Sequence, residues 1–289
     1  MTLENTILQF KNMIEHAIVT ASFDGKCYAN GQKAKEALIR SQKLINLLHE
    51  QVKHSLLENN INISNIFPPI GNSSPELKLT GFFKQKNQDV CIVPNNLNKY
   101  EEYIHDGPLS PIGICDIFGR GYTENILSIN VRSQLSSLSK NTDTLFERTY
   151  AEAYNLHLRC PKMVLGEVYL IPVFEYDEEY MNKNQISFKP NRVNLEKYIS
   201  FFSNINGRLS EYDSYHNYER CALIIVDFSK PLPIIYKNTQ SLKNANLIDP
   251  NFNIELANIS FDYFVRDLIN VYDYRFDLRN IVNEIPYIY

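Results

Sequence analysis

The chain contains no tryptophan and lacks the patterns that define several common protein classes. Its five cysteines are widely spaced and none forms a CxxC pair, which argues against a zinc ribbon or a dithiol redox site. No apolar run approaches the ~20 residues needed to cross a membrane, and the N-terminus mixes charges into an amphipathic pattern that is unlike a signal peptide. We therefore expect a cytoplasmic protein with no membrane partner and with reduced cysteines in its core.

Catalytic signatures based on glycine or histidine are missing as well. The sequence has no GxSxG, GxxxxGK[ST] or GxGxxG motif, so no nucleotide cofactor is expected, and its six histidines form no HxH or HExxH pair. The net charge of −4 gives no global basic field. A nucleic-acid partner would therefore have to meet a locally basic cleft, because phosphate contacts depend on where Lys and Arg lie.

What is present is an alternation of helical and strand patterns typical of one α/β domain. We predict a helical N-terminal region (1–70), a core (77–228) and a C-terminal helical region (229–289). Strands are predicted at 77–94 (two short or one bent), 126–135, 166–174 and 221–228, and helices at 3–57 (broken near Asp24), 144–159, 192–207 and 259–276. The polar segment 95–121, rich in Gly and Pro, is predicted to be a loop.

Polar side chains that could bind a metal ion or stabilise a phosphate lie on or beside two of these strands. Asp89 enters the first strand, and Asn130, Arg132 and Gln134 alternate along the second and so share one face. The stretches KNQDV, ILSINVRSQ and GEVYLIPV, with a helix before the last, resemble the core of PD-(D/E)XK restriction endonucleases over residues 77–174. The resemblance implies a central mixed β-sheet flanked by helices, with Asp89 as a ligand of Mg²⁺. It also places Asn130 and Arg132 where that family has the Glu and Lys of E-x-K.

The neutral Asn130 leaves this site one carboxylate short, and the resemblance suggests where the missing one lies. In a variant of the superfamily the Glu moves to the following helix, and RTYAEAYNL places Glu152 at the matching position. Glu147 is the alternative in the same helix, but the two residues lie about 140° apart and cannot share a face. A plain ion pair of Glu152 with Arg132 or Arg148 is a competing interpretation.

Three further choices stay open. Asp116 is the alternative to Asp89 as the metal-binding acid, although glycines on both sides of it indicate an irregular loop. Arg132 stays protonated and so is expected to stabilise charge on the phosphorus, a duty that Gln134 or Lys140 could share. The polar loop after the second strand is predicted to contact DNA through Ser133, Ser136, Ser137, Lys140 and Asn141. The same composition is typical of an ordinary turn before a helix capped by Asn141 or Asp143.

The resemblance implies a Mg²⁺-dependent endonuclease of Type II restriction type that hydrolyses double-stranded DNA. A homodimer is expected, since two-fold symmetry suits the cutting of both strands of a symmetric site. The loss of E-x-K supports a different class, a catalytically silent subunit that binds DNA or assembles a defence complex. A third alternative is a protein-interaction module that uses the polar loop.

Overall fold

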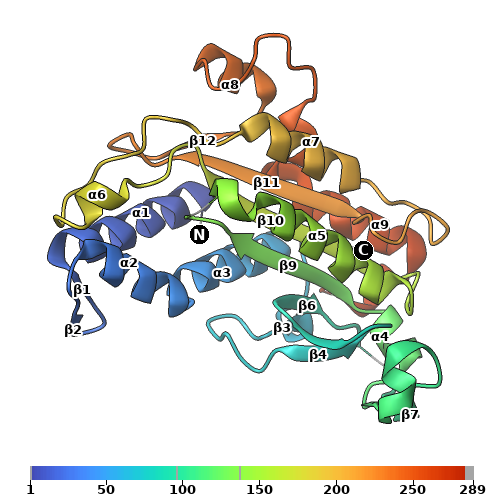
Figure 1. The fold of residues 1–289 in the computed structure, drawn as a ribbon. Coiled ribbons are helices and arrows are strands. Elements are labelled where there is room, and N and C mark those ends of the chain that lie inside the picture. Colours follow the sequence, from blue (N-terminus) through green and yellow to red (C-terminus); the bar gives the residue numbers. More distant parts are fainter. Residues whose placement is uncertain (1, 96, 137, 284–289) are drawn as a thin grey trace, which may run out of the picture.

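A six-stranded mixed β-sheet forms the centre of the computed structural model, which describes residues 2–95, 97–136 and 138–283 (Figure 1). Its strand order is β12-β11-β10-β9-β6-β3. The strands are β3 (Ile66–Phe67), β6 (Val90–Ile92), β9 (Leu127–Ser133), β10 (Val164–Pro172), β11 (Arg220–Asp227) and β12 (Ile234–Tyr236). The fold is therefore α/β, as the sequence predicts.

Strand direction follows the way in which the strands are connected. β3, β6 and β9 pair antiparallel, whereas β9, β10 and β11 are parallel and β12 is again antiparallel to β11. Parallel neighbours need a long crossover, usually a helix. Helix α5 (Leu138–His157) joins β9 to β10, and α7 (Leu195–Ile205) lies between β10 and β11. The predicted order of strand, strand, helix and strand is confirmed in β6, β9, α5 and β10.

Two hydrophobic layers cover the two faces of the sheet. Helices α1 (Leu3–Thr20), α2 (Gly31–Arg40), α3 (Lys43–Glu58) and α9 (Phe261–Arg275) pack on one face, and α5 and α7 pack on the other. Side chains of β10 alternate between these layers, as expected for a strand buried on both faces, whereas the apolar side chains of β9 all belong to the layer under α1, α3 and α9. At Gly166 a Cβ atom would lie 2.7 Å from Phe264, so the absence of a side chain allows α9 to approach the sheet closely.

The structure differs from the sequence predictions at several boundaries. The N-terminal region holds three helices and a small hairpin, and its last residues join the central sheet as β3. Segment 77–94 divides into a separate β4–β5 hairpin and the sheet strand β6. Helix α5 begins at Leu138, earlier than predicted, so Asn141 and Asp143 are not its caps. The remaining α-helices and strands of the described residues are β1 (Ser22–Phe23), β2 (Lys26–Cys27), β4 (Leu77–Thr80), β5 (Gln85–Gln88), β7 (Glu102–Tyr103), β8 (Cys115–Asp116), α4 (Arg120–Glu124), α6 (Glu178–Met181) and α8 (Thr239–Asn244).

Three of the five cysteines lie in the core. All five cysteines are free, and Cys91, Cys160 and Cys221 are buried as predicted. Cys27 is exposed and Cys115 is half-buried, so the prediction of a core position was wrong for these two. Within the described ranges, none of the helices combines the length and the hydropathy needed to cross a membrane.

Candidate functional site

Polar side chains of β9 and β10 meet on the face of the sheet that α5 covers. The odd-numbered residues of β9, such as Ile129 and Val131, belong to the layer under α1, α3 and α9. Alternation therefore turns Asn130 and Arg132 to the opposite face. The parallel register pairs Asn130 with Glu167 of β10, so a buried carboxylate lies directly beside the amide.

Two carboxylates contact one guanidinium group at this place. Nε of Arg132 lies 3.0 Å from Oε1 of Glu167, and its Nη2 forms an ion pair with Glu152 of α5. Nζ of Lys86, in β5, lies 2.7 Å from the other oxygen of Glu152. The side chain of Glu167 is fully buried and that of Glu152 is 6% exposed. We call Lys86, Asp89, Asn130, Arg132, Glu152 and Glu167 the Arg132 cluster.

Asp89 is tied to the same place through the backbone. It lies between β5 and β6, and its Oδ2 accepts a hydrogen bond of 2.8 Å from the amide of Val131, next to Arg132. Asp89 and Arg132 are half-buried, and the side chain of Lys86 is 29% exposed, whereas Asn130, Glu152 and Glu167 are buried. An incoming ligand would therefore meet Lys86, Asp89 and Arg132 first.

The β4–β5 hairpin that carries Lys86 is attached to α5 by one asparagine. Oδ1 of Asn155 accepts hydrogen bonds from the amides of Phe83 and Lys84, at 2.7 and 3.1 Å. A Cβ atom at Gly81 would lie 2.2 Å from the Asn155 side chain, so only glycine permits this approach. The helix that supplies Glu152 therefore also positions the lysine that pairs with it.

Burial shifts the proton affinities in the cluster toward neutral pH. Loss of solvation raises the pKa of Glu167 to about 7, against the lowering effect of Arg132 and Lys86. Loss of solvation, together with repulsion from Arg132, lowers the pKa of Lys86 to about 8. Both groups therefore titrate near physiological pH, a property that is enriched at functional sites.

The other predicted site residues lie elsewhere or are engaged differently. Asp116 is buried against Arg159, with Oδ2 2.6 Å from Nη1, and belongs to the β7–β8 hairpin. Oε1 of Gln134 accepts hydrogen bonds from the hydroxyls of Tyr169 and Tyr198, at 3.0 and 2.8 Å. The alternative acid Glu147 is exposed, whereas Glu152 lies in the cluster. Glu152 does form the ion pair with Arg132 that the competing interpretation predicts. A catalytic role of Glu152 stays a prediction.

The predicted DNA-contacting loop is described only in part. Ser133 ends β9 and is half-buried, whereas Ser136 and Asn141 are exposed. Ser137 lies outside the described residues, and so does the side chain of Lys140. The exposed members are accessible to a ligand, and their role stays a prediction.

Sequence reasoning missed Glu167 and Lys86. Glu167 is the one charged residue in the apolar run VLGEVYLIP, and an acid inside a fully buried strand is a signal in its own right. Lys86 stands three residues before Asp89 in a short hairpin strand whose docking is set by Asn155. The first omission could have been avoided from the sequence, and the second could not.

The donor chemistry of the cluster suits Mg²⁺, but the described arrangement does not form a metal site. Asp89, Glu152 and Glu167 offer carboxylate oxygens, and Oδ1 of Asn130 is buried with no hydrogen-bond partner among the described residues. Within the described part of the chain, however, no three or more His, Cys, Asp or Glu side chains are arranged so that they could hold a metal ion. Two cations, Lys86 and Arg132, contact the carboxylates instead.

Comparison with known proteins identified no relative of this chain. The chain matches no family model, and searches among curated proteins and solved structures gave no match. The chemistry of the Arg132 cluster is therefore the feature of the molecule that points to a function.

Proposed function

We propose that the chain is a cytoplasmic Mg²⁺-dependent endonuclease of Type II restriction type, which hydrolyses double-stranded DNA as a homodimer. The observation that carries the proposal is the gathering of three carboxylates, Asp89, Glu152 and Glu167, around Arg132 and Lys86. The elements β6, β9, α5 and β10 follow one another along the chain in the order that we expect from the resemblance to PD-(D/E)XK nucleases. Metal-dependent hydrolysis of a phosphodiester needs carboxylates that hold the metal ion and activate water, and it needs cations that bind the phosphate.

The chain's own residues divide these tasks. A DNA phosphate carries the charge that can replace Glu152 as the partner of Lys86 and Arg132, so substrate binding releases a carboxylate. Arg132 then stabilises the charge that develops on the phosphorane, because its guanidinium stays protonated. Glu167, with its pKa near neutrality, accepts the proton of the attacking water. Mg²⁺, held by Asp89 and the released Glu152 with Asn130 beside them, would supply Lewis-acid activation of the scissile phosphate.

The proposal is tested by digesting mixed plasmid and phage DNA with Mg²⁺, using wild type, Asp89→Ala and Glu152→Ala purified in the same way. Wild type is expected to give discrete fragments, and both variants are expected to lose them, because each removes a carboxylate that the reaction needs. Glu147→Ala is the matched control, since this acid lies on α5 but is exposed. Fragments of equal yield from all four proteins would place the activity outside the Arg132 cluster.

Cleavage should also depend on pH in a way set by the cluster. The rate is expected to rise as pH passes through about 7, where Glu167 loses its proton and becomes able to accept one from water. It should fall again above about 8, where Lys86 loses the positive charge that binds phosphate. The pH dependence of kcat/KM across this range, measured at DNA concentrations well below saturation, checks the prediction because it reports the groups of the free protein. A rate that is constant from pH 6 to 9 would exclude Glu167 as the proton acceptor.

A catalytically silent DNA-binding subunit is the second candidate, and a specific observation favours it. Glu152 is already neutralised by two cations, and the strand position of the usual Glu holds Asn130. In that case the cluster is a structural ion-pair network. Wild-type protein that binds DNA in a mobility-shift assay and leaves it intact with Mg²⁺ would support this candidate.

A further inference from the structure

A second candidate site lies away from the Arg132 cluster, in a cavity of about 640 Å³ that aromatic, aliphatic and charged side chains line. It opens where the 208–215 loop, the first residue of β11 and the end of α9 meet. Its volume is within the range of small-molecule sites. The side chains that matter for its chemistry are Lys162, Glu211, Tyr212, Arg220, Tyr274 and Arg275.

Two of these side chains are aromatic and almost fully exposed. Tyr212 is 88% exposed and Tyr274 is 86% exposed, more than any other large hydrophobic residue in the described part of the chain. Both line the same cavity although they are far apart in the sequence. Exposed aromatic faces beside a cavity are the stacking platforms on which unpaired bases are bound.

The same cavity carries an excess of positive charge. Lys162 and Arg220 line it against the single carboxylate of Glu211, while Arg275, also in the lining, is paired with Glu219. The pair between Lys162 and Glu211 is loose, with 3.7 Å between Nζ and Oε2, and the Lys162 side chain is 53% exposed. An anion can therefore recruit Lys162 without breaking a buried interaction.

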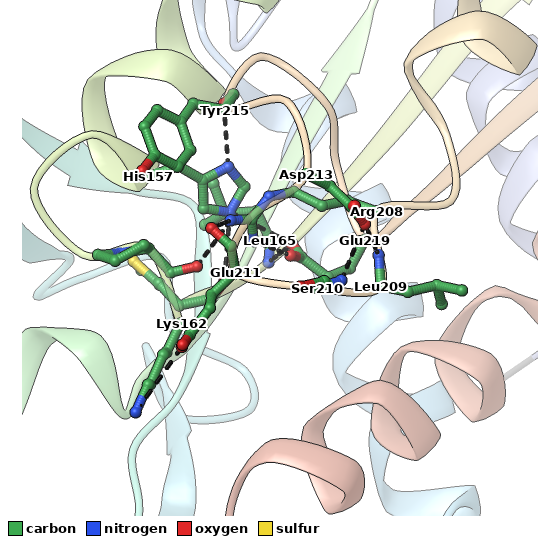
Figure 2. Close-up of polar contacts among 12 residues, drawn as sticks. His157, Lys162, Leu165, Arg208, Leu209, Ser210, Glu211, Asp213, Tyr215 and Glu219 are labelled. Atoms are coloured by element: carbon green, nitrogen blue, oxygen red, sulfur yellow. Dashed lines mark hydrogen bonds and ion pairs between the residues drawn. The ribbon is translucent and has the colours of Figure 1, made fainter.

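A buried ion pair holds the floor of the cavity, and hydrogen bonds at the surface hold the loop. Nη1 of Arg275 lies 2.7 Å from Oε1 of Glu219, and its Nη2 donates to the carbonyl of Leu209 at 2.9 Å. Figure 2 shows the 208–215 loop folded beside Glu219, with Asp213 turned toward the loop backbone. Oδ2 of Asp213 accepts hydrogen bonds from the amides of Leu209 and Ser210, at 3.0 and 2.9 Å. The loop that presents Tyr212 is thus ordered before any ligand binds, which lowers the entropy cost of binding.

We propose that this cavity binds one unpaired nucleotide, with its base on Tyr212 or Tyr274 and its phosphate on Arg220 and Lys162. A nucleoside monophosphate unit combines the flat ring and the anion that the lining calls for, and Asn270, also in the lining, can hydrogen-bond the edge of a base. The unit can come from a free mononucleotide or from single-stranded DNA. The inference does not depend on cleavage at the Arg132 cluster.

Calorimetric titration of the intact chain tests the proposal with three probes: thymidine 5′-monophosphate, inorganic phosphate and a short single-stranded oligothymidylate. Wild type is expected to bind the mononucleotide more tightly than phosphate. The variant that removes the stacking tyrosine, Tyr212→Ala or Tyr274→Ala, should weaken that binding about tenfold, the size of one base–aromatic stack. Arg220→Gln should weaken both the mononucleotide and phosphate. Tyr103→Ala is the matched control, since Tyr103 is 63% exposed and lies in β7, outside this cavity.

The outcomes separate the two sources and expose a failure. Tighter binding of the oligonucleotide than of the mononucleotide identifies single-stranded DNA as the source, and the reverse order identifies a free nucleotide. Absence of binding of both nucleotide probes, equal affinity for phosphate and mononucleotide, or unchanged affinity in both tyrosine variants would each overturn the proposal. These experiments measure binding and not DNA cleavage. A failure of the proposed nuclease is therefore distinguished from a failure of the nucleotide site.

Discussion

Replacing Glu167 by Gln should lower the rate of DNA cleavage by about 10³-fold, in the middle of the range for loss of a general base. The amide has nearly the shape of the carboxylate and stays next to Arg132, but it cannot accept a proton from water. Glu167 is assigned this role because it is buried beside Arg132 and burial raises its pKa to about 7. DNA affinity should change little, because Arg132 and Lys86 keep their charges. The measurement is a single-turnover cleavage rate together with a mobility-shift affinity.

A matched variant separates chemistry from a general effect of losing an acid. Glu147→Gln removes one negative charge from α5 at an exposed position, and its cleavage rate should stay within about twofold of wild type. Thermal unfolding of Glu167→Gln should remain a single cooperative transition. Wild-type cleavage by Glu167→Gln would remove this residue from the mechanism and favour a structural role for the ion pair with Arg132.

Replacing Glu219 by Gln should lower the free energy of unfolding by about 3–5 kcal/mol, the usual cost of removing one partner from a buried ion pair. Glu219 is fully buried and one of its oxygens lies 2.7 Å from Nη1 of both Arg208 and Arg275 (Figure 2 shows Arg208 and Glu219). His157 lies 3.4 Å from the other oxygen. Without the carboxylate, Arg208 keeps a buried positive charge and loses its acidic partner. Urea unfolding at neutral pH measures the loss.

The carboxylate of Glu219 also makes the free energy of unfolding depend on pH in the acid range. His157, Arg275 and Arg208 overcome the opposing effect of burial and lower the pKa of Glu219 to about 2, from an ordinary value of 4.5. A lowered folded-state pKa contributes stability above about 4.5, which is lost as pH falls from there toward 2. The difference between wild type and Glu219→Gln should therefore shrink over this range. Glu36→Gln, which breaks a partly exposed pair with Lys33, should cost less than about 1 kcal/mol at neutral pH. Equal effects of the two substitutions would contradict the account.

Much of the fold could be predicted because the buried strands have clear patterns. Alternation along 126–135 predicted both the strand β9 and the shared face of Asn130 and Arg132, and the apolar runs predicted β10 and β11. β3 could not be predicted, because two residues are too few to show a period and their place at the sheet edge is decided by pairing with β6. The early start of α5 was hidden by serines and one asparagine, residue types that favour turns as strongly as helix starts.

The members of the candidate site could be predicted only where a short sequence motif determines which side chain faces the cluster. Glu152 was chosen over Glu147 from a motif, and the structure places Glu152 inside and Glu147 outside. The contact between Arg132 and Glu167 depends on the register of two parallel strands separated by a helix, which no local pattern encodes. Gln134 lies beyond the cluster because two tyrosine hydroxyls donate to its side chain, and those partners are 35 and 64 residues away.

The central claim, that this chain cuts DNA with its Arg132 cluster, is tested most directly by one digestion. Wild-type protein is incubated with mixed plasmid and phage DNA, with Mg²⁺ or with EDTA, and the products are separated on a gel beside a mobility shift of the same samples. Discrete fragments with Mg²⁺ and intact DNA with EDTA are the predicted result. DNA that is shifted but uncut with Mg²⁺ would contradict the claim and establish a binding protein in place of a nuclease.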